Sequence, residues 1–229
     1  MSLNTADALR QGYKDVKSRD GLTLASALFV LQLAMLATTT SWLSTSGFSL
    51  PGPSYLWGVV TIILGLSEMV VVYGAMRTFN QDDLTALSDE AFERNWLMTL
   101  INLIVGGIVF GIVVGIAGVI FFPVALWLMI GLLLWQVYVA LEDQNFVEAM
   151  RSSWSATKGS KIELTVLFAA ILLTGAVLQG PTTVWTTLLA LTVPSTWLSG
   201  LASVIGLIIS SLFAIYTVGT LVEVYKQLE

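Results

Sequence analysis

Long apolar runs alternate with short polar segments along the whole chain. The runs predict six membrane-spanning helices, at roughly residues 22–44, 55–78, 96–119, 123–141, 163–180 and 196–222. Most of them reach the ~20 apolar residues that an α-helix needs to cross a hydrocarbon core of ~30 Å. The predicted fold is therefore all-α, an integral membrane bundle of six transmembrane helices within residues 22–229.

The polar segments between the predicted spans fall into two classes by charge. Those at 45–54, 120–123 and 181–195 carry no charged residue, and all 10 Lys and Arg residues lie in or beside the others. A count of six spans places the cationic segments on one side of the membrane, and positive loops are retained in the cytoplasm. We therefore predict a multi-pass protein of the cell membrane with both termini cytoplasmic. Residues 181–195 form either a re-entrant helix or a plain loop at the outer face.

Residues 1–21 show the spacing of an amphipathic helix that lies on a membrane surface. One helical stripe is apolar, and it consists of Ala6, Leu9, Tyr13 and Val16. Cations border this stripe, and two acids, Asp7 and Asp15, are predicted to face water. Apolar contact on one side, with long basic side chains at its margins, is typical of interfacial helices.

Residues 144–160 repeat this pattern ahead of the fifth span. Three identities support an alignment at an offset of 141 positions, namely Ala8 with Ala149, Arg10 with Arg151 and Lys17 with Lys158. A fainter third copy precedes the third span, so the chain would consist of three units, each an interfacial helix followed by a transmembrane hairpin. In the second copy we expect Trp154 in the headgroup layer and Arg151 and Lys158 near lipid phosphates.

The second copy, EAMRSSWSATKGS at 148–160, also carries a family resemblance. It resembles a motif of poorly characterised polytopic proteins that are related to the membrane domain of some glycerophosphodiester phosphodiesterases, and similar stand-alone proteins are frequent in halophilic archaea. The matching residues are Glu148, Ala149, Arg151, Ser153, Trp154, Thr157, Lys158 and Gly159. The resemblance implies a six-span helical fold. It does not imply phosphodiesterase activity, which belongs to a separate soluble domain that uses His and metal-binding carboxylates.

Composition narrows the classes of function. The chain is 56% hydrophobic and 11% charged, against roughly 25% charged residues in soluble domains. It contains no His and no Cys, which removes the commonest general base and the commonest transition-metal ligand. The formal net charge of −5 argues against nucleic acid as a partner, because phosphate binding needs a basic face. We therefore expect no enzyme activity, no catalytic residue, no metal and no cofactor, and membrane lipids as partners.

Glu68 lies roughly midway along the second predicted span. An acidic side chain at this depth costs ~3 kcal/mol on insertion scales. Judged by depth, its candidate partners are Gln32, Asn102 and Gln136 on the first, third and fourth spans. No cation lies at that depth, so we expect a neutral carboxyl group. Two roles remain open: a proton or cation site in a cavity open to the cytoplasm, or hydrogen bonds that join helices.

Three glycines recur every four residues in the third span, at Gly107, Gly111 and Gly115. A stripe of small residues lets another helix approach closely. We expect this stripe to pack within one subunit, with packing between subunits as the alternative.

Three classes of function remain. A lipid-modifying enzyme is the weakest, because no interfacial cluster of His, Asp or Lys is present. A transporter normally shows discontinuous helices or several polar groups at the midplane, and these spans contain one central acid and few Pro. We therefore expect a non-catalytic scaffold, assembly or accessory subunit, with a protein partner or a second copy in the membrane. The alternative is a transporter or channel for a small solute, a proton or a lipid that uses Glu68.

Overall fold

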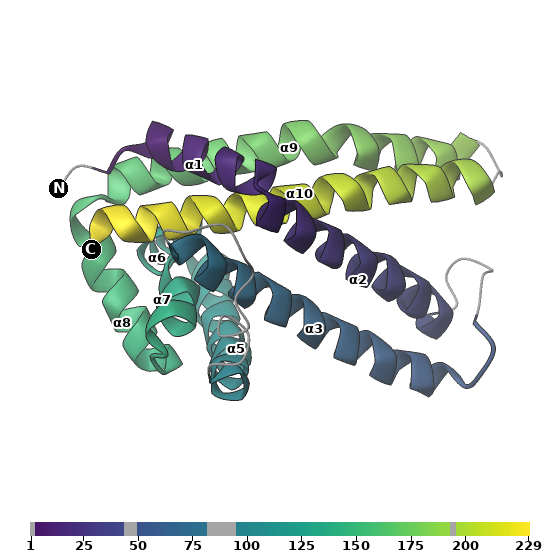
Figure 1. Ribbon diagram of the computed structural model, residues 1–229, viewed down its shortest axis with the longest axis horizontal. Coiled ribbons are helices and arrows are strands. Elements are labelled where there is room, and N and C mark those ends of the chain that lie inside the picture. Colours follow the sequence, from purple (N-terminus) through teal and green to yellow (C-terminus); the bar gives the residue numbers. More distant parts are fainter. Residues whose placement is uncertain (1–2, 44–49, 82–94, 193–195) are drawn as a thin grey trace.

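The computed structural model describes residues 3–43, 50–81, 95–192 and 196–229 (Figure 1). Every element in these ranges is helical, which confirms the predicted all-α class. The helices are α1 (Thr5–Lys17), α2 (Arg19–Leu43), α3 (Ser54–Asn80), α5 (Trp96–Ile120), α6 (Phe122–Gly131), α7 (Trp135–Glu142), α8 (Phe146–Ala156), the short 3-10 turn η1 (Thr157–Gly159), α9 (Lys161–Thr192) and α10 (Thr196–Leu228).

Six helical stretches are long and apolar enough to cross a membrane, in agreement with the six predicted spans. They are Arg19–Thr40, Ser54–Asn80, Trp96–Ile120, Phe122–Glu142, Lys161–Leu188 and Gly200–Leu228. Both ends of the chain lie at the same end of the molecule (Figure 1), as an even number of crossings requires. We call this the terminal end, and the opposite end, where α2 connects to α3 and α9 to α10, the loop end.

The fifth span is longer than predicted. Helix α9 continues through Pro181 to Thr192, so residues 181–192 are neither a re-entrant helix nor a loop, and residues 193–195 lie outside the described part of the chain. Pro is tolerated in transmembrane helices where Ser or Thr side chains bond to nearby backbone groups. Here the hydroxyl groups of Thr182 and Thr183 donate to the carbonyl oxygen of Gln179, at 2.8 and 3.0 Å.

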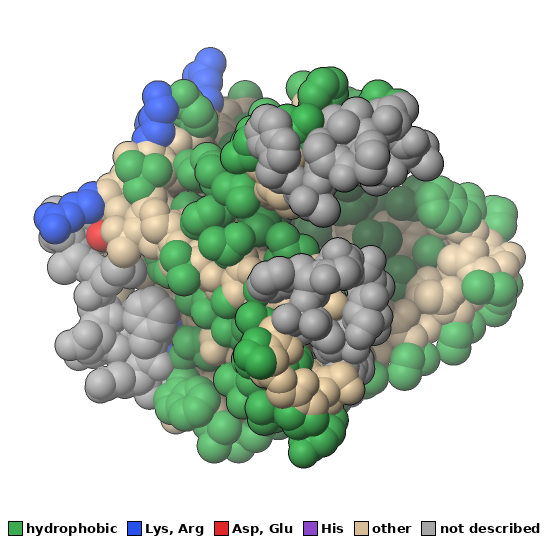
Figure 2. Space-filling view, turned by 90° about the vertical axis from the view of Figure 1, so that its right-hand side faces the viewer, with side chains coloured by type: hydrophobic (Ala, Val, Ile, Leu, Met, Phe, Trp, Pro, Cys, Tyr) green, Lys and Arg blue, Asp and Glu red, His purple; other side chains and the backbone are tan. Residues whose placement is uncertain are grey.

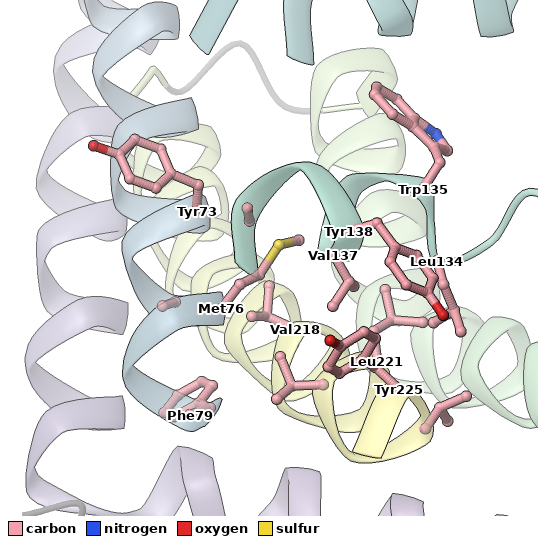
Figure 3. Close-up of a cluster of buried hydrophobic side chains, with 14 of the residues drawn as sticks. Tyr73, Met76, Phe79, Leu134, Trp135, Val137, Tyr138, Val218, Leu221 and Tyr225 are labelled. Carbon is pink, nitrogen blue, oxygen red and sulfur yellow. The ribbon is translucent and has the colours of Figure 1, made fainter. Parts of the chain in front are cut away.

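The best-buried part of the molecule lies near the terminal end, where α3, α7 and α10 meet (Figure 3). Tyr73 and Val137 are fully buried there, and the rings of Tyr138 and Tyr225 meet edge to face with their centroids 5.1 Å apart. The fourth span contributes most to this core. Half of its apolar window is buried, against 11% of the window in the third span.

The third span stands apart from the bundle along most of its length. Helix α5 buries only residues in its first half, from Thr99 to Gly106, and is seen almost end-on in Figure 1, where α9 and α10 run across the view. Its far end is highly exposed, with Val119 at 91% and Ile120 at 77%. An end view shows a hollow with hydrophobic side chains along its walls (Figure 2).

The N-terminal segment divides into two helices that meet at Ser18. Residues 5–17 form α1, which lies along the second half of α10 (Figure 1), and residues 19–21 already belong to the first spanning helix. The face that α1 buries consists of Ala8, Gly12 and Asp15.

The position of Asp15 corrects a prediction. Asp15 was expected to face water, and it is only 3% exposed. Gly12 and Gly219 allow α1 and α10 to come so close that a Cβ atom on Gly219 would lie 2.6 Å from Asp15 Oδ2. The sequence pattern of α1 alone does not contain this information, because the covering surface belongs to the other end of the chain.

Candidate functional site

The fourth span is a discontinuous helix. Helix α6 ends at Gly131, and α7 begins at Trp135 after a turn of three leucines. Leu132 (φ −105°, ψ 13°) and Leu134 (φ −96°, ψ 0°) leave the helical conformation. A break in a membrane span exposes backbone groups that water cannot reach, and each unsatisfied group costs several kcal/mol. The broken span therefore needs hydrogen-bond partners from elsewhere in the protein.

Two side chains of the 148–160 motif supply these partners. Ser153 Oγ accepts a hydrogen bond from the N–H of Leu134 and donates to the carbonyl oxygen of Gly131, both at 3.1 Å. Thr157 Oγ1 lies 3.0 Å from the same carbonyl oxygen. Both hydroxyl-bearing residues are fully buried. The motif thus supplies hydrogen bonds to the backbone groups that the break leaves free. The sequence pattern, which suggested a helix on the membrane surface, did not predict this role.

Trp154 packs against the same point from the side. A Cβ atom on Gly131 would lie 2.5 Å from Cζ3 of Trp154, so only glycine fits there. The Trp154 ring also meets Trp127 of α6 edge to face, at 4.4 Å between centroids. The ammonium group of Lys161, which the sequence did not single out, lies 3.5 Å from the Trp127 centroid and 3.9 Å from the Trp154 centroid. We call Gly131, Ser153, Trp154, Thr157 and Lys161 the lock.

The other residues of the predicted interfacial motif point outward. Glu148, Arg151, Lys158 and Gly159 are exposed, and a Cβ atom on Gly159 would meet nothing within 4 Å. Their expected contacts with lipid headgroups therefore stay a prediction. The motif separates into a buried half that closes the break and an exposed half that is accessible to other molecules.

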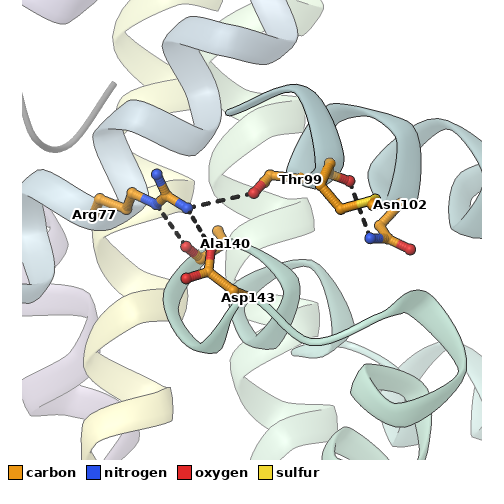
Figure 4. Close-up of polar contacts among 6 residues, drawn as sticks. Arg77, Thr99, Asn102, Ala140 and Asp143 are labelled. Atoms are coloured by element: carbon orange, nitrogen blue, oxygen red, sulfur yellow. Dashed lines mark hydrogen bonds and ion pairs between the residues drawn. The ribbon is translucent and has the colours of Figure 1, made fainter. Parts of the chain in front are cut away.

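A buried arginine fixes α7 to its neighbours (Figure 4). Arg77 of α3 is 8% exposed. Its Nε donates to the carbonyl oxygen of Ala140 at 2.7 Å, and its Nη2 donates to Asp143 Oδ1 at 2.8 Å and to Thr99 Oγ1 at 3.3 Å. These contacts join α3, α5 and the end of α7. From the sequence alone, Arg77 counted only as one of the cations that set the topology.

Glu68 borders a cavity of about 220 Å³ between α3, α5 and α7. Gln136, one of its three predicted partners, lies in the lining, two residues after the turn that breaks the fourth span. The remaining lining is mainly apolar, with Leu103 from α5 and Met69 and Val72 from α3. Within the described part of the chain, Glu68 Oε1 is buried and has no hydrogen-bond partner. The structure thus places one carboxyl group and one amide beside the discontinuity.

The structure places the other two predicted partners elsewhere. Gln32 Oε1 accepts a hydrogen bond from Ser211 Oγ at 3.1 Å and so joins α2 to α10. Asn102 Oδ1 accepts from the N–H of Phe146 at 3.3 Å, at the start of α8. Depth along a span was estimated from sequence position, but the rotation of each helix decides which side chains meet.

The glycine stripe of α5 also corrects a prediction. A Cβ atom on Gly107, Gly111 or Gly115 would meet nothing within 4 Å, so the stripe does not pack against any described helix of the same subunit. The neighbouring Gly106 is the closely packed one, since a Cβ atom there would lie 2.5 Å from the Trp135 ring. The expected packing within one subunit is therefore wrong for the described residues.

Comparison with known proteins assigns the chain to a family. A family model described as a domain of unknown function (DUF7847) matches residues 3–228. No curated protein and no solved structure matches the chain. The family match includes all described helices, so the lock and the Glu68 cavity both lie inside it. The relation to the phosphodiesterase membrane domain stays a prediction.

Proposed function

We propose that this chain, which belongs to the family described as a domain of unknown function (DUF7847), is a membrane transporter that carries protons on Glu68. One observation carries the proposal: a buried carboxyl oxygen without a hydrogen-bond partner in the described residues borders a cavity beside a broken span. Ionisable groups inside a membrane usually mark ion or substrate pathways. Discontinuous helices near the midplane are a recurring feature of transporter binding sites.

The composition of the cavity favours a proton over a metal ion. Calcium takes six to eight oxygen ligands, and Mg²⁺ requires near-ideal octahedral coordination. The lining of the cavity offers the Glu68 carboxyl group and the Gln136 amide among mainly apolar side chains. A single carboxyl group can bind and release a proton without a coordination shell. We infer that the lock keeps α7, and with it Gln136, in position beside Glu68.

The break in the fourth span favours a transporter over the scaffold or accessory subunit that we expected from the sequence. From the sequence, a transporter ranked second because the spans contain one central acid and few Pro residues. The turn at 132–134 breaks the fourth span, and it lies within two residues of the cavity lining at Gln136.

Proton flux into liposomes tests the proposal. The purified protein would be reconstituted with a pH-sensitive dye inside the vesicles, and a potassium diffusion potential would drive proton entry. We expect flux above that of empty vesicles, and its loss in Glu68→Gln, which keeps the shape of the side chain and removes the titratable group. Glu148→Gln, at an exposed acid outside the cavity, is the matched control. Equal flux in Glu68→Gln and the native protein would contradict the proposal.

A second candidate function is a scaffold or accessory subunit of a membrane complex. The open glycine stripe on α5 supports it, because such stripes allow close approach of another transmembrane helix and no described helix of this chain fills it. Extraction in mild detergent followed by native mass spectrometry would reveal a stoichiometric partner or a second copy. We expect Gly111→Leu to release that partner, and Ile112→Leu on the same helix to retain it. A monomer without partners would contradict this candidate.

We also infer that the terminal end faces the cytoplasm of the cell. The support is the gathering of Lys and Arg in the segments at that end, which the positive-inside rule assigns to the cytoplasm. The chain contains no Cys, so a single introduced Cys reports its side without background. We expect a membrane-impermeant maleimide to label Tyr55→Cys in intact cells and Ala6→Cys only after lysis. The reverse pattern would overturn this orientation.

A further inference from the structure

A groove lies between α1, α9 and α10, and its lining contains neither Glu68 nor any residue of the lock. Its volume is about 560 Å³, within the range of small-ligand sites (~300–1,000 Å³). Leu9 and Tyr13 line it from α1, and Leu178, Leu212 and Phe213 line it from the two spans. Arg10 is the one charged residue of the lining. The groove thus combines a long apolar wall with a single cation.

The floor of the groove offers few free polar atoms. The hydroxyl group of Thr174 donates to the carbonyl oxygen of Ala170 at 2.8 Å. Phe213 covers the backbone of α9, since a Cβ atom on Gly175 would lie 2.9 Å from the Phe213 ring. Because α9 and α10 are membrane spans by length and composition, this apolar wall faces hydrocarbon in a bilayer.

The charge beside the groove is mainly positive, because two of the three acids between residues 5 and 20 are buried and only Asp7 is exposed. Asp15 is 3% exposed and Asp20 is 5% exposed. The exposed charges of residues 10–19 are then all cations, and they are Arg10, Lys14, Lys17 and Arg19. Lys and Arg side chains project from the edge of the molecule beside a hydrophobic surface (Figure 2).

Arg10 forms no ion pair with any described residue. The ion pair found among these residues joins Arg77 to Asp143, and Asp7, one turn before Arg10, accepts a hydrogen bond from Asn4 Nδ2. The guanidinium group is therefore available to bind a phosphate, with which it forms charge-assisted and often bidentate hydrogen bonds.

We propose that this groove binds one anionic phospholipid, with an acyl chain along α9 and α10 and the phosphate on Arg10. A lipid fits both halves of the site, since the wall is apolar and the mouth is cationic. A second transmembrane helix would match the apolar wall alone, because an apolar span carries no anion for Arg10. The proposal also gives α1 a function, because this helix forms one wall of the groove.

Native mass spectrometry of reconstituted protein tests the proposal. The protein would be incorporated into vesicles of equal parts phosphatidylglycerol and phosphatidylcholine with identical acyl chains, re-extracted in mild detergent, and weighed with its retained lipid. We expect one retained lipid per chain, with phosphatidylglycerol preferred about tenfold, because the choline cation of phosphatidylcholine is repelled by Arg10 and offsets the attraction of its phosphate. Arg10→Gln should abolish this preference. Lys14→Gln makes the same charge change on the same helix outside the lining, and it should lower the preference far less than Arg10→Gln does.

A groove-filling variant tests the apolar half separately. Thr174→Trp places a large ring in the groove and should lower the retained amount of both lipids, while Thr165→Trp, at an exposed position of α9, should not. Equal retention of the two lipids by the native protein would overturn the proposal, and so would equal effects of Arg10→Gln and Lys14→Gln. These two results do not depend on the folding of the tryptophan variants.

Discussion

The segments that contain the two amphipathic helices, α1 and α8, share three identities at aligned positions, but the helices pack against different kinds of span. Ala8 and Ala149 are equivalent and both fully buried. Four residues later, α1 has Gly12 against the continuous helix α10, whereas α8 has Ser153 against the broken fourth span. A continuous helix such as α10 forms all its backbone hydrogen bonds internally, so α1 needs no polar side chain at this position. Glycine there lets the two helices approach closely. A broken helix needs a hydroxyl group at the same position.

Helices α1 and α8 each pack against the second span of a transmembrane hairpin. Helix α8 packs against the closing span of the hairpin that precedes it, and α1 packs against α10, the closing span of the last hairpin. Of the two, α8, which packs against the fourth span, also closes its break. The predicted third copy, before α5, falls largely on residues 82–94, outside the described part of the chain.

The largest effect is expected from giving α1 the residue of α8. In Gly12→Ser, the new Cβ atom would lie 2.8 Å from the backbone oxygen of Tyr216, and overpacking of this kind costs ~1–3 kcal/mol. We expect a loss near 3 kcal/mol and release of α1, measured by denaturant unfolding in detergent and by proteolysis at the N-terminus. Gly159→Ser, where a Cβ atom meets nothing within 4 Å, is the control. Normal protection of α1 in Gly12→Ser would show that the contact is not tight.

The reverse change removes the hydroxyl group from α8. Ser153→Ala leaves the N–H of Leu134 buried without its partner, at a cost of ~1–3 kcal/mol. We expect a decrease of about 2 kcal/mol in the unfolding free energy, together with faster hydrogen exchange at 132–135. Ser155→Ala, at an exposed position on the same helix, should behave like the native protein. Unchanged exchange in Ser153→Ala would mean that the break does not depend on the lock.

A smaller effect is expected at Lys161, which is equivalent to Asp20 in the first unit. Its ammonium group contacts the faces of Trp127 and Trp154, and such contacts contribute ~0.5–2 kcal/mol. We expect Lys161→Gln to lower stability by about 1 kcal/mol and to alter tryptophan fluorescence. Lys158→Gln, at an exposed cation, is the matched control. Identical fluorescence of both variants would exclude a cation–π contribution.

The smallest expected effect is a pH dependence of stability that arises from Asp15 in α1. Burial raises the pKa of Asp15 above its ordinary value of 3.8, although the hydrogen bond from Gln11 and the charges of Lys226 and Lys14 oppose the shift and Glu223 adds to it. The folded state then holds the proton more tightly than the unfolded chain, so stability falls as pH rises from 3.8 towards the raised pKa. We expect Asp15→Asn to remove this slope in unfolding experiments between acid and neutral pH. Asp7→Asn should keep it, and an unchanged slope in Asp15→Asn would assign the dependence to another group.

The number and position of the spans follow from the sequence because hydrophobic length decides them. The break in the fourth span does not. Residues 132–134 are three leucines, which are good helix formers, and the partners that stabilise the turn are Ser153 and Thr157, far away in the chain. A local pattern cannot report a conformation that a distant segment stabilises.

The candidate site was predictable in part, for a related reason. Glu68 and Gln136, which were grouped by their depth along the spans, both line one cavity. Gln32 and Asn102 do not line it, and a single sequence could not show this, because it leaves the rotation of each span open. Ser153 and Thr157 belonged to the recognised motif. The predicted role of that motif, however, was based on the charged residues Arg151 and Lys158 and on the ring of Trp154.

The contact between the two ends of the chain has a consequence for biosynthesis. The backbone N–H of Asn4 donates to Gln227 Oε1 across 223 positions, and the surface that covers Asp15 belongs to α10. Helix α1 therefore leaves the ribosome before its docking surface on α10 exists, a delay of tens of seconds at ~5–20 residues per second. During this time Asp15 and its neighbours have no docking surface, so a nascent chain that stalls before α10 presents an undocked N-terminal helix to the quality-control machinery of the cell.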